Sequence, residues 1–152
     1  MRRLARILTG LAAATMVLGW WFEVDQMEAF LFQHNRNFRN ISGLVLAGLI
    51  VFQWCLTLGR TVFQRNGSQW GRWIEWHLRS AILMPVGVVV HSISLGWGLL
   101  ALLPVSLLAA AYFGSLLEGD AAIRKHLKLH IGLSALTLGL TAVHAWTVLV
   151  FN

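Results

Sequence analysis

The stretch SAILMPVGVVVHSISLGWGLLALLPVSLLAAAYFGSLL (residues 80–117) has no Asp, Glu, Lys or Arg in 38 consecutive positions. A single helix of that length would extend about 57 Å, nearly twice the ~30 Å hydrocarbon layer of a membrane. At its centre lies GWG (96–98), in which two turn-permissive glycines flank a tryptophan, a residue typical of membrane interfaces. The stretch therefore predicts two membrane-spanning helices, over 74–95 and 98–117, joined by a tight turn.

Further apolar segments lie on both sides of this stretch. Residues 4–22 carry one charge, residues 41–59 carry none, and the helix expected over 126–151 is uncharged from position 129 onward. Each is long enough to cross a bilayer. We therefore predict an all-α integral membrane bundle of five transmembrane helices, which forms a single domain over residues 1–152.

The composition fits a membrane protein and excludes other classes. Hydrophobic residues make up 57% of the chain and charged residues 12%, about half the ~25% of a soluble domain. Cys55 is the only cysteine, which excludes a disulfide framework and a cysteine-held zinc or iron–sulfur site. The formal net charge of +6 needs a separate explanation, because it could also indicate nucleic-acid binding.

The positions of the basic residues explain that charge. If the N-terminus is cytosolic, five crossings put ten of the 12 Lys and Arg residues inside and leave Arg36 and Arg39 outside. The excess of positive charge then reflects topology, and no nucleic-acid partner is expected. We expect a chain surrounded by membrane lipid in the cytoplasmic (inner) membrane of a bacterium, with its C-terminus outside.

Four histidines lie within the predicted spans, where ionisable side chains are costly and usually functional. The helix expected over 74–95 carries His77 and His91, and the last helix carries His130 and His144, each pair 14 positions apart. Fourteen residues are about 40° short of four full turns and rise by about 21 Å. Both histidines of a helix therefore share one face, one near each side of the membrane.

One intervening helix makes these two helices parallel. His77 then shares its depth with His130 near the cytosolic face, and His91 shares its depth with His144 near the outer face. Two facing imidazoles can serve as the axial ligands of a haem iron, so two haem b groups are expected. A re-entrant loop over 98–117 would instead pair His77 with His144. Packing is the ordinary role of any one such histidine, but identical spacing on two helices favours ligation over packing or a zinc or copper site.

Arginines near the two membrane faces are candidates to pair with haem propionates. Arg36 and Arg39 would serve the outer haem, and Arg72 and Arg79 the cytosolic one. Anchoring at the membrane surface explains each of these residues equally well.

The segments WHLRSAILMPVGVVVH (76–91) and HIGLSALTLGLTAVH (130–144) resemble the haem-binding helices of di-haem membrane cytochromes b. In the cytochrome b of quinol:cytochrome c oxidoreductases, two parallel helices separated by one helix each supply two histidines at similar spacing. The transmembrane domain of ferric reductases and NADPH oxidases uses its third and fifth helices, the order expected here. The resemblance covers about 75 residues and implies the same four histidines as axial ligands.

The departures from these families shape the expected function. Ferric reductases have a sixth helix and flavin and nicotinamide domains, which are not found in this sequence. The Pro-Glu-Trp-Tyr quinol-site motif of bc-type cytochromes is also absent from it. We therefore expect an electron-transfer subunit of an oxidoreductase complex rather than a complete enzyme. It would relay electrons across the bilayer between a quinone pool and a partner cytochrome or reductase subunit. The alternatives are a self-contained quinol-dependent reductase of a small outer acceptor, and a haem-free membrane scaffold or assembly subunit.

Overall fold

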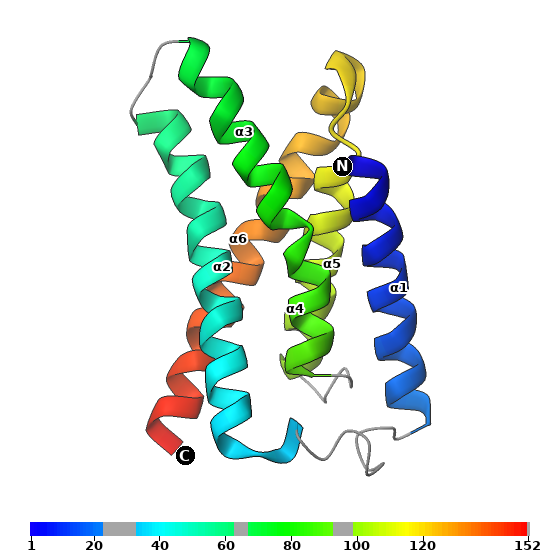
Figure 1. Ribbon diagram of the computed structural model, residues 1–152, viewed down its shortest axis with the longest axis vertical. Coiled ribbons are helices and arrows are strands. Elements are labelled where there is room, and N and C mark those ends of the chain that lie inside the picture. The colour runs from blue at the N-terminus through cyan, green and yellow to red at the C-terminus, as the bar shows by residue number, and fades with distance from the viewer. Residues whose placement is uncertain (23–32, 63–66, 93–98, 152) are drawn as a thin grey trace.

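The computed structural model describes residues 1–22, 33–62, 67–92 and 99–151, and this part of the chain is helical apart from short turns, with no strand. The expected all-α class is therefore confirmed. Figure 1 shows the N-terminus in the upper part of the molecule and the C-terminus at its lower end. The helices are α1 (Arg2–Trp21), α2 (Arg36–Val62), α3 (Gly67–Ala81), α4 (Leu83–His91), α5 (Leu99–Ser115) and α6 (Gly119–Phe151).

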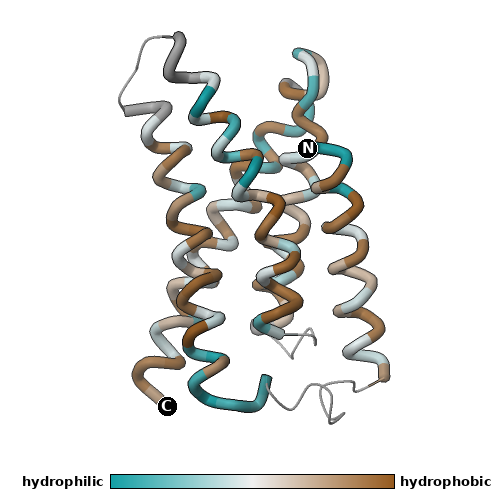
Figure 2. Tube along the Cα trace, in the orientation of Figure 1, coloured by the Kyte–Doolittle hydropathy of each residue, from teal (hydrophilic) through white to brown (hydrophobic). Residues whose placement is uncertain are grey.

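Three helical segments are long and apolar enough to cross a membrane: Arg2–Trp21, Arg36–Gly59 and Lys125–Phe151. A shorter apolar helix covers Ala101–Ser115. At most 22% of any of the three long segments is buried within the protein, so most of their apolar side chains face outward. Figure 2 shows hydrophobic residues along the middle of the helices, with hydrophilic residues more frequent towards their ends. Such a surface needs an apolar environment, as an integral membrane protein has.

The second helix begins earlier than its hydropathy predicted. It starts at Arg36 rather than at position 41, because Asn35 caps it. The Asn35 Oδ1 atom accepts hydrogen bonds from the backbone amides of Asn37 at 2.9 Å and Phe38 at 3.2 Å. The last helix likewise begins at Gly119 rather than at 126. Both extensions are polar, so a search for apolar runs does not detect them.

The helix expected around Pro85 is divided in two. A proline has no N–H and its ring clashes with the carbonyl four residues earlier, which here belongs to Ala81. Helix α3 ends at Ala81 and α4 begins at Leu83, with the Pro85 side chain fully buried. Helix α4 ends at His91, and the glycine–tryptophan turn expected at 96–98 lies outside the described residues.

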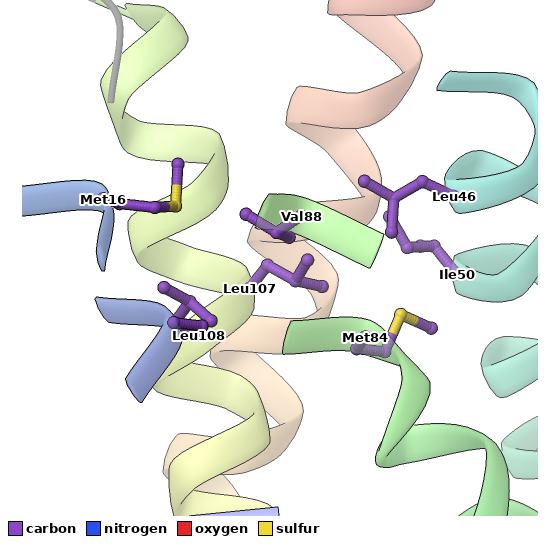
Figure 3. Packing of buried hydrophobic residues seen from close by; sticks show 8 residues of the cluster. Met16, Leu46, Ile50, Met84, Val88, Leu107 and Leu108 are labelled. Carbon is purple, nitrogen blue, oxygen red and sulfur yellow. The ribbon is translucent and has the colours of Figure 1, made fainter. Parts of the chain in front are cut away.

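The buried core lies around α4, which packs against α1, α2 and α5. Helix α6 packs chiefly against α5, with a smaller contact to α2. In an apolar solvent, close packing of side chains replaces water exclusion as the main force holding helices together. Figure 3 shows the buried hydrophobic side chains of this core, which point towards one another. The cluster consists of Ala12, Met16, Leu46, Ile50, Met84, Val88, Leu107 and Leu108.

Candidate functional site

The structure brings the four histidines of the predicted spans together as two facing pairs. The 77/130 pair joins His77 of α3 to His130 of α6, with ring centroids 6.3 Å apart and ring planes at 87°. The 91/144 pair joins His91 of α4 to His144 of α6, with centroids 6.4 Å apart and planes at 73°. These are the two pairings expected from matching depth, and all four side chains are partly buried.

The separation within each pair suits a metal ion between the rings. A metal–imidazole nitrogen bond is about 2.0–2.1 Å, and that nitrogen lies about 1.15 Å from the ring centre, so two opposed ligands put their ring centres about 6.4 Å apart. Edge-to-face aromatic pairs also occur at about 4.5–7 Å, so distance alone does not separate ligation from packing. The hydrogen bonds of the rings provide a second criterion.

One histidine of each pair has its Nδ1 atom engaged. The Nδ1 atom of His130 lies 2.9 Å from the backbone carbonyl oxygen of Ala110, which can only accept. In a neutral imidazole the hydrogen is then on Nδ1, and the lone pair on Nε2 remains for a metal. The Nδ1 atom of His91 lies 2.9 Å from the Ser42 hydroxyl. Metal-binding histidines characteristically donate their second N–H to such an acceptor.

Two glycines make room for these engaged rings. A Cβ atom at Gly114 would lie 2.8 Å from Cε1 of His130, and one at Gly43 would lie 3.1 Å from Cε1 of His91. The first distance is a clash, and the second is tight. The two rings therefore lie directly against the backbones of α5 and α2, which fixes where each ring can point.

Helix α2 also holds the two histidine-bearing helices at the level of the 77/130 pair. The Gln53 amide donates to the backbone carbonyl of His77 at 3.1 Å and to the Ser80 hydroxyl at 2.7 Å. The adjacent Trp54 indole donates to the backbone carbonyl of Ser134 in α6 at 3.3 Å. Two neighbouring residues of α2 thus hold α3 on one side and α6 on the other.

The end of α4 is fixed beside the 91/144 pair. The buried Gln33 side chain donates to the backbone carbonyls of Val89 at 3.1 Å and Val90 at 3.2 Å. The last carbonyls of a helix have no partner within the helix, so this amide acts as a cap. The cap comes directly before His91 and restrains the backbone that carries it.

Two buried polar atoms have no hydrogen-bond partner among the described residues: Nδ1 of His144 and Oε1 of Gln53. Leaving such an atom unsatisfied costs about 1–3 kcal/mol, so natural proteins rarely do so away from functional sites. Both atoms belong to the histidine pairs or their supports. Both atoms could therefore form a hydrogen bond with a bound molecule.

A dry layer separates the two pairs. Along their helices, Met84 and Val88 lie between His77 and His91, and both are buried. Thr137, midway between the histidines of α6, is only 2% exposed, and its hydroxyl bonds to that of Ser106 at 3.0 Å. The buried residues between the pairs are therefore closely packed and include hydroxyl groups as well as apolar side chains.

The four arginines considered as propionate partners are all exposed. Arg79 forms an ion pair with Glu75, one turn away on α3. Arg39 lies close enough to His91 for their charges to interact, which places it near the 91/144 pair. Arg36 and Arg72 lie at the start of α2 and within α3. Of the four arginines, Arg39 thus lies near the 91/144 pair, and Arg79 follows His77 by two residues on α3.

In the part of the chain that the structure describes, no group of three or more His, Cys, Asp or Glu side chains could hold a metal ion. Each histidine pair therefore consists of two imidazole rings with no third side chain of these types beside them among the described residues. A metal held by two imidazoles needs further ligands, which a cofactor can supply. Haem iron meets this condition, because the porphyrin supplies the four other nitrogens.

No known protein family, curated protein or solved structure matches the chain.

Several supporting residues were not singled out from the sequence. Ser42 and Gln53 are polar side chains within an otherwise apolar predicted span, and that pattern could have identified them. The carbonyl of Ala110 and the space at Gly114 leave no such signal, because they depend on which helix packs beside His130.

Proposed function

We propose that this chain is a b-type membrane cytochrome that binds two haems and relays electrons across the bilayer. The main support is the repeated geometry of the histidines. Both pairs have the ring separation of opposed metal ligands, and each contains one imidazole whose Nδ1 atom is engaged. Chance packing of four histidines explains neither the repeat nor the shared hydrogen-bonding pattern.

In this proposal the chain's own residues hold and orient the cofactors. His77 and His130 would hold one haem, and His91 and His144 would hold the other. The carbonyl of Ala110 fixes one ring of the first pair, while the packed middle layer excludes water between the sites. Bound haem supplies reversible one-electron chemistry, which the ligands and the dry surroundings tune.

The proposal includes a topology. Five crossings, with α3–α4 counted as one, make the histidine-bearing helices parallel and put the 77/130 pair near the cytosol. The distribution of Lys and Arg supports a cytosolic N-terminus, and the cytoplasmic membrane of a bacterium is the proposed location. A quinone at one face and a partner cytochrome or reductase subunit at the other would supply and remove electrons.

A reduced-minus-oxidised visible spectrum of the purified chain, with haem quantified per chain, tests this function. Two b-type haems per chain are expected. A stably folded protein that contains no haem after expression in haem-replete cells would contradict the proposal and leave a membrane scaffold. Steady turnover with a quinol analogue and a small acceptor alone would instead identify a self-contained reductase.

A further inference from the structure

Ser42 is half-buried on α2 and contacts an imidazole nitrogen of the 91/144 pair. Its Oγ atom lies 2.9 Å from Nδ1 of His91, 2.8 Å from the carbonyl oxygen of Phe38 and 3.3 Å from that of Arg39. A serine hydroxyl has one hydrogen to donate and two lone pairs to accept with. When that hydrogen goes to the Phe38 carbonyl, one turn earlier in the helix, the oxygen accepts from the His91 N–H.

We propose that Ser42 is a positioning residue that holds His91 as the Nδ1–H tautomer, with Nε2 available towards His144. The inference rests on the proposed function, because it assigns His91 as an axial ligand. A hydrogen bond from Nδ1–H makes the opposite nitrogen more basic. A more basic ligand stabilises the oxidised iron, so Ser42 lowers the reduction potential of the haem at the 91/144 pair.

The backbone beside Ser42 allows the His91 ring to approach α2 closely. Gly43 is next to Ser42, and a Cβ atom there would lie 3.1 Å from the His91 ring. At the other pair the same role falls to the backbone carbonyl of Ala110, which a change of side chain does not remove. A single side-chain hydroxyl therefore positions the ring at the 91/144 pair, whereas a backbone carbonyl has this role at the 77/130 pair.

A redox titration of the full-length haem protein tests the proposal, using wild type, Ser42→Ala, Ser42→Thr and Thr57→Ala. His91→Ala identifies which wave belongs to the 91/144 pair, because it removes that wave. In Ser42→Ala we expect this wave to move to a higher potential, and the dissociation constant of that haem to rise about 10- to 100-fold. The other wave stays in place and reports that the fold is intact.

The two remaining variants separate positioning from packing. Ser42→Thr keeps the hydroxyl and should keep the wild-type potential. Thr57 is the matched control, because its hydroxyl also bonds to a carbonyl one turn earlier in α2, that of Gln53 at 3.1 Å. Thr57→Ala should leave both waves unchanged.

Other results of the redox titration would contradict the proposal. Two unchanged waves in Ser42→Ala would overturn the role of Ser42 while leaving the two-haem function in place. A shift to lower potential, or an equal shift of both waves, would also overturn it. A wild-type chain without haem would overturn the proposed function and this inference together.

Discussion

The two histidine pairs have nearly equal ring separations, 6.3 and 6.4 Å, yet they are supported in different ways. At the 77/130 pair the engaged ring bonds to a backbone carbonyl of α5, and at the 91/144 pair it bonds to a side chain of α2. The first support follows from helix packing alone, whereas the second depends on one residue. Two sites with similar geometry can thus differ in how strongly a side-chain substitution affects them.

Removing a histidine should have the largest effect and tests the pairing itself. His91→Ala and His144→Ala should each abolish the same haem signal, and His77→Ala and His130→Ala should each abolish the other. Haem content per chain and the redox titration measure this. If His91→Ala and His130→Ala removed the same haem, the pairing would be wrong.

The two glycines beside the engaged rings should differ in their tolerance of a methyl group. Gly114→Ala would put Cβ 2.8 Å from the His130 ring, and Gly43→Ala would put it 3.1 Å from His91. We expect Gly114→Ala to lose most of the haem at the 77/130 pair and to destabilise the fold by about 1–3 kcal/mol through overpacking. The haem loss in Gly43→Ala should be smaller.

Gly132→Ala provides the control for both variants. A Cβ atom at Gly132 meets nothing within 4 Å, so the variant should keep both haems and gain slightly in helix propensity. Haem content and thermal unfolding in detergent compare the three proteins. Equal haem loss in all three would show that the close approach at His130 does not matter.

The ring planes give a spectroscopic difference between the pairs. In the proposed function, ring planes at 87° and 73° would place the two imidazoles that hold each haem nearly perpendicular to one another. Perpendicular axial planes leave two iron d orbitals close in energy, so the oxidised protein should give highly anisotropic low-spin EPR signals, more so for the 77/130 pair. A three-line rhombic signal from both haems would show that the planes are parallel instead.

Arg79→Gln should have the smallest effect. The ion pair with Glu75 is exposed, and pairs of this kind contribute about 0–1 kcal/mol. Haem content and the midpoint potentials should stay as in the wild type. A shift of the 77/130 wave alone would show that Arg79 interacts with a haem propionate in the loaded protein.

Much of this architecture could be predicted from the sequence because apolar runs and a fixed 14-residue spacing report directly on helices and faces. The all-α class and the meeting of His77 with His130 and of His91 with His144 followed from these patterns. The break near Ala81 agrees with the position of Pro85, because proline kinks or ends a helix. The complete division into two helices could not be predicted, because it depends on how tightly the core encloses the proline.

The supports of the site could not be predicted in the same way. Which atom engages the Nδ1 of His130 depends on the rotation of α5 about its axis, and every residue of that helix has a carbonyl. The early start of α2 depends on the local bonding of Asn35 rather than on hydropathy. The sequence pattern therefore predicted where the histidines meet, while tertiary packing determines how each ring is held.

The closely packed layer between the pairs also determines which particles can pass. Its apolar side chains, such as Met84 and Val88, carry no titratable group, while the buried hydroxyls of Thr137 and Ser106 bond to each other. An electron can cross such a layer by tunnelling between the sites. In a charged membrane, each full crossing by one charge is worth about 2.3 kcal/mol per 100 mV. In the proposed function, electron transfer across this layer would therefore work with or against the membrane voltage.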